Sequence, residues 1–200
     1  YDIRDQISPN IDGAAIVEYQ YDHNGILVKR SYFNENYKPT ISKLTGYSTL
    51  VQKVNSKGQV IHGTCLGIHG EKINNKSGFC SQITNYNRLG MPCKFKLYDK
   101  EGNPVVCKEG WSVQEHEITN DRNGNTQYAI STYGMNLENV IETNTLTHKV
   151  IYTYNDVGQC VEESYWGTDY SPCNNKFGYA KCKYFLASLK KFFVYVFAFL

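Results

Sequence analysis

The stretch YDHNG (residues 21–25) joins two segments, residues 14–21 and 26–33, and so decides how the chain is interpreted. Residues 14–21 place apolar and polar side chains alternately, a period of two that is typical of a strand with one buried face. Asp22 followed by Gly25 suits a tight hairpin turn, in which Gly takes a positive φ. The same residues match the opening of a calcium loop. The stretch alone leaves both interpretations open.

The turn sequence recurs at nearly constant spacing. Turn-type glycines stand at Gly25, Gly58, Gly90, Gly124 and Gly158, at intervals of 33, 32, 34 and 34 residues. A second series in phase with the first comprises Gly13, Gly46, Gly78, Gly110 and Gly178, of which the last four precede an aromatic residue. Where a further pair is due, the sequence has Leu146-Thr147. A third landmark, Pro39, Pro104 and Pro172, keeps the same phase, which indicates an internal repeat.

Each unit of 32 to 36 residues reads as one hairpin and a connector. A single hairpin cannot bury its apolar face alone, so neighbouring hairpins must pair or stack. We therefore predict an all-β fold, a tandem antiparallel β-hairpin repeat array of five units over residues 13–185, in an extended or curved, solenoid-like sheet. Residues 1–12 are the N-terminal flank. Residues 186–200 are an apolar tail, interpreted as the start of a membrane segment, a capping strand or a truncation artefact.

These residues resemble a known family. Tyr21-Asp22-x-x-Gly25, Tyr98-Asp99-x-x-Gly102 and the variants at 86–90 and 154–158 look like the YD repeat of bacterial RHS-type proteins, and residues 163–184 look like a longer variant of it. The resemblance covers residues 13–185. It implies β-hairpin arrays that build shells or stalks, display other domains and hold no catalytic residues. The unit is longer here than the usual YD repeat, and several Tyr-Asp pairs are lost, so a closed shell is not implied.

Two functional hypotheses follow. The first is a non-enzymatic scaffold or display segment of a bacterial cell-surface or secreted protein, with a protein partner. The second is a carbohydrate or cell-wall binding module, whose aromatic side chains stack on sugar rings. Its candidates are the second-strand aromatics Tyr32, Phe33, Tyr98, Tyr165 and Trp166. The same residues could instead pack hairpin against hairpin as cross-strand pairs. A membrane-attached cytoplasmic location stays open through the Lys pair that precedes the tail.

Calcium binding is the weaker interpretation of the turns. An EF-hand loop needs a Glu at its twelfth position, but counting from Asp22 that position is Phe33, and from Asp121 it is Thr132. Other copies of the turn carry Lys57 or Leu89 inside the loop, which suits a turn and not an ion site. We therefore expect no metal and no cofactor.

Residues 63–67 (GTCLG), with His69 close by, imitate a nucleophile elbow in which Cys65 replaces Ser. Such an elbow needs a strand before it and a helix after it. The repeat places Cys65 at the end of a second strand, equivalent to Tyr32, Leu97 and Tyr165, and no helical pattern follows. We predict a core-filling Cys and no enzyme.

Composition adds two limits. A net charge of +2 without a dense basic run gives little reason to expect a nucleic-acid partner. The seven Cys contain no C-x-x-C motif, and their disulfide state stays open.

Overall fold

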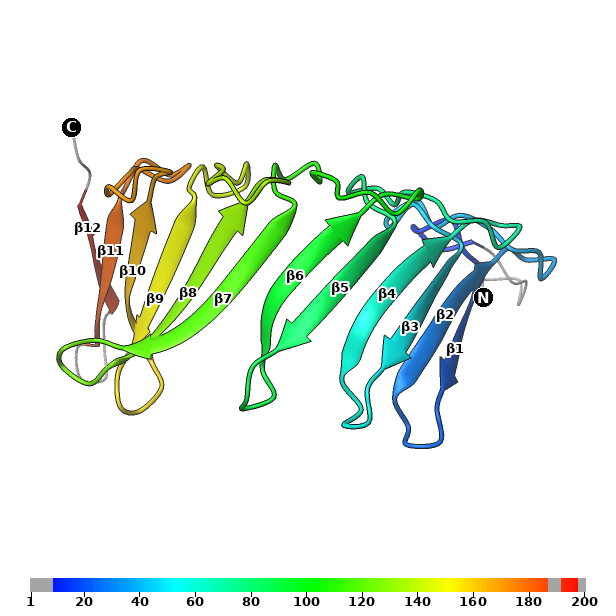
Figure 1. Ribbon diagram of the computed structural model, residues 1–200, viewed down its shortest axis with the longest axis horizontal. Helices are drawn as coiled ribbons and strands as arrows, with labels where there is room; N and C mark the ends of the chain where they lie inside the picture. Colours follow the sequence, from blue (N-terminus) through cyan, green and yellow to red (C-terminus); the bar gives the residue numbers. More distant parts are fainter. Residues whose placement is uncertain (1–8, 187–191, 198–200) are drawn as a thin grey trace. The chain divides into compact units, whose positions relative to one another are not determined.

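The computed structural model describes residues 9–186 and 192–197, and all regular secondary structure in these residues is β-strand (Figure 1). Antiparallel hairpins follow one another in chain order, which confirms the predicted all-β hairpin array. The strands are β1 (Ile16–Tyr21), β2 (Leu27–Phe33), β3 (Thr49–Val54), β4 (Val60–Leu66), β5 (Ser81–Tyr86), β6 (Pro92–Tyr98), β7 (Val113–Asn120), β8 (Thr126–Tyr133), β9 (Lys149–Tyr154), β10 (Cys160–Trp166), β11 (Lys181–Leu186) and β12 (Phe192–Phe197).

The chain forms two compact units. The first comprises Tyr1–Asn85 and Phe95–Cys107, and the second comprises Tyr86–Lys94 and Lys108–Leu200. In the first unit β1 to β5 pair in sequence, and in the second β7 to β12 do the same. Within each unit, strands adjacent in the chain therefore pair with each other, as a repeat array requires.

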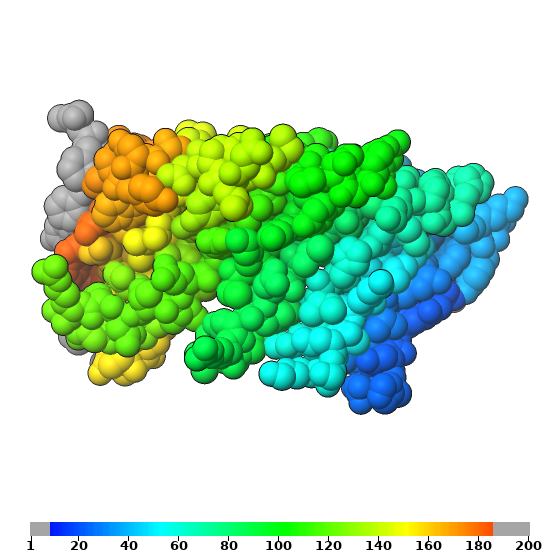
Figure 2. All heavy atoms as spheres, in the orientation of Figure 1, coloured from blue at the N-terminus to red at the C-terminus, as the bar shows by residue number. Residues whose placement is uncertain are grey.

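The hairpin tip at residues 22–25 shows the turn geometry. The Asp22 N–H donates to the Ile26 carbonyl at 2.9 Å, and the Gly25 N–H donates to the Asp22 carbonyl at 3.0 Å. The Asp22 carboxylate accepts the N–H groups of Asn24 and Ile26, both at 2.9 Å. This Asx turn needs a residue with positive φ at its fourth position, which Gly25 supplies at 77°. The tips of the first unit protrude separately, as the blue and cyan ends in Figure 2 show.

Each repeat contains three such turns, where the sequence analysis found two series. All ten glycines of the two series have positive φ. The additional turn follows the second strand, for example at residues 34–37, where the Asn34 N–H donates to the Lys38 carbonyl at 2.9 Å. Its positive-φ residues are Tyr37, Gly70, Gly102, Leu137 and Tyr170. Three of these five are not Gly, so a search for recurring glycines does not detect this turn. At the degenerate pair, Leu146 retains the turn with a φ of 61°.

The connector after each second strand folds back over that strand. The Thr40 N–H donates to the Tyr32 carbonyl at 3.0 Å, and the Ile73 N–H donates to the Cys65 carbonyl at 3.2 Å. Burial is concentrated under this fold-over, where Tyr32, Cys65, Ala14 and Tyr47 form a cluster in the first unit. The open half of each hairpin, toward its tip, is more exposed.

Successive connectors are also joined to each other by backbone hydrogen bonds. In the first unit the Lys76 N–H donates to the Thr45 carbonyl at 2.9 Å. In the second unit the Lys176 N–H donates to the Thr145 carbonyl at 3.0 Å. The turns that carry the second glycine series therefore stack on one another, in addition to the strand pairing.

The ends of the predicted array extend slightly. The first turn begins at Asn10, inside the predicted flank of residues 1–12, since its N–H donates to the Ala14 carbonyl at 2.8 Å. Residues 1–8 lie outside the described part. Part of the predicted tail, residues 186–200, forms β12, which pairs antiparallel with β11. Residues 187–191 and 198–200 lie outside the described part.

Candidate functional site

Within each unit, consecutive hairpins meet at pairs of buried residues that occupy equivalent places in the repeat. One member lies next to the end of a second strand, and the other is the second residue after a positive-φ turn residue. The N–H of the first donates to the carbonyl of the second at 2.8 to 3.0 Å. We term each pair a joint. The joints within the two units are Tyr32/Ser48, Cys65/Cys80, Thr132/His148 and Tyr165/Ala180, and all eight residues are at most 6% exposed.

The two residues of a joint differ in size from copy to copy. A Tyr on the second strand is paired with Ser48 or Ala180, whereas Thr132 is paired with the larger His148. Cys65 and Cys80 are both small. The large residue of a joint can therefore stand at either position.

The joints place two of the predicted sugar-stacking residues in the interior. The ring of Tyr32 lies 5.9 Å from that of Tyr47, and the Arg30 guanidinium lies over both rings and bonds to the Tyr47 hydroxyl. The Tyr165 hydroxyl donates to Glu163 Oε2 at 2.6 Å. Burial, followed by this bond to a carboxylate, raises the pKa of Tyr165. Both rings are buried between hairpins, and Tyr165 also borders the hollow described below.

The other three candidates, Phe33, Tyr98 and Trp166, lie on the opposite face of the sheet and are partly exposed. Each forms an isolated β-bridge to a proline of the folded-back connector: Pro39, Pro104 and Pro172 respectively. This explains why the proline landmark keeps phase with the aromatic residues. The Phe33 ring is covered by that of Tyr37, with centroids 4.7 Å apart and planes 17° apart.

Trp166 borders a hollow with a volume of about 360 Å³. Pro172, Lys181 and Lys183 also line it. Both lysines pair with Glu162, with Nζ to carboxylate oxygen distances of 2.9 Å and 3.5 Å. The Trp166 indole N–H donates to Ser164 Oγ at 3.1 Å, which fixes the ring orientation. An aromatic wall beside polar groups is the composition of a small-molecule site, and we regard this hollow as the candidate site.

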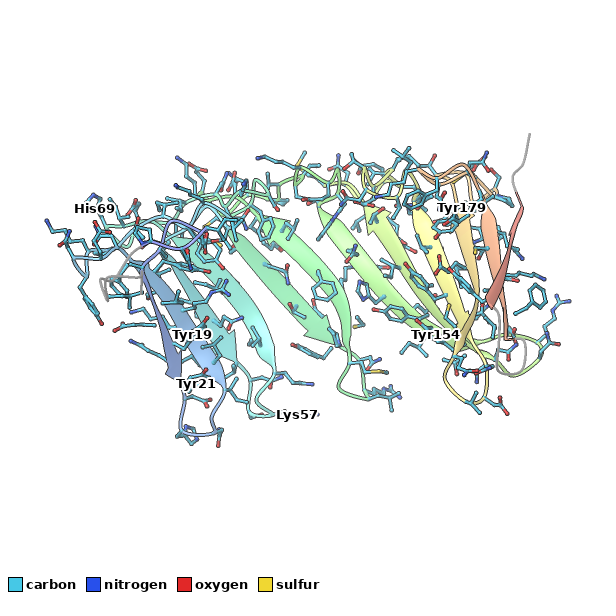
Figure 3. The ribbon with its side chains drawn as sticks, turned by 180° about the vertical axis from the view of Figure 1, so that it is seen from behind. Tyr19, Tyr21, Lys57, His69, Tyr154 and Tyr179 are labelled. Atoms are coloured by element: carbon cyan, nitrogen blue, oxygen red, sulfur yellow. The ribbon has the colours of Figure 1, made fainter. Side chains whose placement is uncertain are left out.

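Tyrosines also occupy the open half of the hairpins. Tyr19 and Tyr21 project from β1 toward its tip and are 52% and 59% exposed (Figure 3). In the second unit burial raises the pKa of Tyr128, Tyr152 and Tyr154, because neighbouring side chains exclude water from them. Their hydroxyls are therefore protonated at neutral pH, and they act as neutral hydrogen-bonding groups.

Cys65 lies 4% exposed in its joint, and burial raises the pKa of its thiol to about 11. A thiol in this state is not a nucleophile at neutral pH. The strand β4 ends at Leu66 and a turn follows, so the geometry of a nucleophile elbow is absent from residues 63–70. His69 lies in that exposed turn, at the opposite end of the hairpin from Lys57 (Figure 3).

The turn carboxylates bond to the backbone. Asp121 accepts the N–H groups of Asn123 and Asn125 at 2.8 Å and 2.9 Å, and the bond from the Asn125 side chain lowers the pKa of the carboxyl. In the described part of the chain, no group of three or more His, Cys, Asp or Glu side chains has an arrangement that could hold a metal ion. Residues 9–186 and 192–197 also include no helix with the length and apolar character needed to cross a membrane.

Two features of the site were not predicted from the sequence. One is the buried His148, at a position that other repeats fill with a small residue; its only signal was the loss of the glycine-aromatic pair at residues 146–147. The other is that neighbouring aromatic residues of a second strand lie on opposite faces of the sheet. A scan against profiles of known protein families and a search of curated proteins find no match to this chain.

Proposed function

We propose that the chain is a non-enzymatic repeat scaffold, a display segment of a bacterial cell-surface or secreted protein that holds flanking parts in place for protein interactions. The observation that carries this proposal is that the features repeated from unit to unit are structural. The positions that recur at the repeat spacing are the turn residues with positive φ and the buried joints. Both kinds of position build the array, as a scaffold requires.

The exposed hairpin tips support the same proposal. Their central residues differ from copy to copy, from His23-Asn24 to Ser56-Lys57, Arg88-Leu89, Arg122-Asn123 and Asp156-Val157. A ligand bound once per repeat would need the same side chains in each tip. A scaffold needs only that each tip can turn, which the Asx residue and Gly provide.

Retention on cell-wall material tests the scaffold proposal. Purified protein is incubated with peptidoglycan and with a glycan array, beside Trp166→Ala and Tyr98→Ala variants. A scaffold predicts that the wild type and both variants are retained equally weakly. Specific retention of the wild type that both variants lose would overturn the proposal.

The hollow beside Trp166 favours a second candidate function, carbohydrate or cell-wall binding. An indole ring offers an apolar face for the C–H groups of a sugar, and Lys181 and Lys183 offer hydrogen-bond donors beside it. The chain has one other tryptophan, Trp111, which provides a matched control. Carbohydrate binding predicts that Trp166→Ala abolishes retention and that Trp111→Ala keeps it. Equal retention of both variants would contradict binding at this hollow.

A further inference from the structure

The joint between β8 and β9 contains the one fully buried histidine of the described residues. His148 is 1% exposed. The equivalent residues Ser48, Cys80, Ser112 and Ala180 are small and cannot acquire charge near neutral pH, and each is also 1% exposed. The second unit therefore places an ionisable group where the other copies of the repeat have none.

Hydrogen bonding assigns the protons of the His148 ring. Nδ1 lies 2.7 Å from the carbonyl oxygen of Thr132, which can only accept, so Nδ1 carries the hydrogen. Nε2 then holds a lone pair, and it is buried with no hydrogen-bond partner among the described residues. A proton added to Nε2 would place a charge in the interior, away from water.

The ring also joins two loops. It lies edge-on to Tyr133 and to Tyr170, with centroids 5.3 Å and 5.4 Å away. Tyr170 bonds through its hydroxyl to Asn139 Oδ1 at 3.3 Å, and Asn139 Nδ2 donates to the Thr168 carbonyl at 2.7 Å. His148 and Asn139 thus hold the connector of residues 134–148 against the turn at residues 167–170.

Two strands and two loops supply the groups that surround the His148 ring. On the strands, Tyr133 and the Thr132 carbonyl face it from β8, and Lys149 adjoins it at the start of β9. From the loops, Tyr170 faces it, as does the Val140 carbonyl of the connector. Glu109 and Glu142 line, together with His148, a second hollow of about 300 Å³. The Glu142 oxygens accept the N–H groups of Asn144 and Thr145 at 2.9 Å. The described residues place no carboxylate in a hydrogen bond to the ring.

We propose that the Thr132/His148 joint is an acid-sensitive junction, at which protonation of His148 releases the connector of residues 134–148 from the turn at residues 167–170 while the other joints stay closed. This adds a regulated point to the scaffold and does not depend on which partner the scaffold holds. The protonated ring must leave the joint to reach water, because His148 is 1% exposed in the closed joint.

The sign of the effect follows from proton linkage. Burial lowers the pKa of His148, and this outweighs the two carbonyls that favour the charged ring. Above the pKa of an unfolded histidine, about 6.5, both states are neutral and the joint has its full stability. As the pH falls below that value the open state takes up a proton and the closed state does not, so the closed joint loses stability down to its own lowered pKa.

Hydrogen exchange at pH 7 and pH 5, with times scaled to the intrinsic exchange rate at each pH, tests the proposal. The segment of residues 134–148 is compared with the equivalent connector at residues 167–180 in the same molecule. We expect the opening of residues 134–148 to increase at pH 5, by at most about thirtyfold, the limit reached when the open state, with a pKa of about 6.5, binds the proton and the closed state does not. The backbone of residues 173–180 should change little.

Two variants isolate the histidine. The double substitution Thr132→Tyr with His148→Ser reproduces the Tyr32/Ser48 joint and removes the ionisable group. His148→Gln keeps a neutral donor in a single substitution, and it serves if the double variant fails to fold. The proposal predicts that the acid-dependent opening of residues 134–148 is lost in the folded variant. Persistence of that opening, or its absence in the wild type, would overturn it. His62 and His116, whose pKa values burial also lowers, remain in all variants and control for their titration.

Discussion

The joints Thr132/His148 and Tyr165/Ala180 have the same backbone geometry and opposite side-chain arrangements. Their joining N–H to carbonyl distances are 3.0 Å and 2.9 Å. In one joint the large residue, His148, directly precedes the first strand of the later hairpin, and in the other the large residue, Tyr165, is on the second strand of the earlier hairpin. The comparison shows that the large residue of a joint can stand at either position.

The turns that precede the two joints differ in the same concerted way. Gly178 and Tyr179 precede Ala180, and the Tyr179 ring lies 5.8 Å from that of Tyr165. Leu146 and Thr147 precede His148, and the buried Thr147 is hydrogen-bonded to Thr145 through the two hydroxyls at 2.9 Å. Thus the pair at 146–147 that looks degenerate in sequence belongs to an alternative packing of the same joint.

The largest loss of stability is expected from breaking the Tyr165/Ala180 joint. Tyr165→Ala removes a buried ring that Ala180 cannot replace, and it should lower the free energy of unfolding by about 3–5 kcal/mol. Tyr165→Phe removes only the hydroxyl bond to Glu163 and should cost about 1 kcal/mol. Urea unfolding of both variants measures the difference. Equal losses would show that the hydrogen bond, and not the volume of the ring, stabilises this joint.

A smaller effect is expected at the turn before Ser48 in the Tyr32/Ser48 joint. A Cβ added at Gly46 would lie 2.6 Å from the Lys76 backbone nitrogen, which bonds to the neighbouring Thr45 carbonyl. We expect Gly46→Ala to cost roughly 3 kcal/mol, because a clash adds to the strain of positive φ. A Cβ added at Gly25 has no atom within 4 Å. Gly25→Ala should therefore cost only the strain of positive φ, about 1–2 kcal/mol. Thermal unfolding of the two variants checks this, and equal losses would contradict a role for stacked connectors.

The smallest change in stability is expected from giving the turn before the Thr132/His148 joint the glycine that other repeats have there. Leu146 holds a φ of 61°, which favours Gly. Leu146→Gly should therefore raise the free energy of unfolding by up to about 1 kcal/mol, and Gly178→Leu should lower it by a similar amount. Differential scanning calorimetry resolves shifts of this size as changes of a few degrees. A loss of stability in Leu146→Gly would mean that the Leu side chain contributes packing that outweighs its backbone strain.

The hairpins and two of their three turns could be predicted from the sequence, because the period-two alternation and the two series of glycines reflect local backbone preferences. It did not reveal the third turn of each repeat, since Tyr37, Leu137 and Tyr170 take the positive φ that Gly70 and Gly102 take elsewhere. These side chains are tolerated because the surrounding hydrogen bonds fix the turn, and one of them, Tyr37, also gains a ring contact with Phe33.

The sequence also could not separate the two faces of the second strand. Tyr32 and Phe33 are both aromatic, as are Tyr165 and Trp166. The alternation of apolar and polar residues therefore does not indicate which aromatic of each pair is buried and which is exposed. The choice of buried member depends on the joint with the next hairpin, a contact between residues at least 15 positions apart, such as Cys65 and Cys80. Such pairing is tertiary information that local patterns do not contain.

In-phase deletion of one repeat tests most directly whether the chain is an array of interchangeable hairpins closed by joints. Removing residues 59–90, which are 32 in number, leaves the turn of residues 55–58 intact and joins Gly58 to Met91. Removing the 28 residues 59–86 instead joins two turns and destroys the phase. We predict that the first variant unfolds in one cooperative urea transition with a β-sheet circular dichroism spectrum, and that the second does not fold. Failure of the in-phase variant to fold, or equal behaviour of the two deletions, would contradict the account.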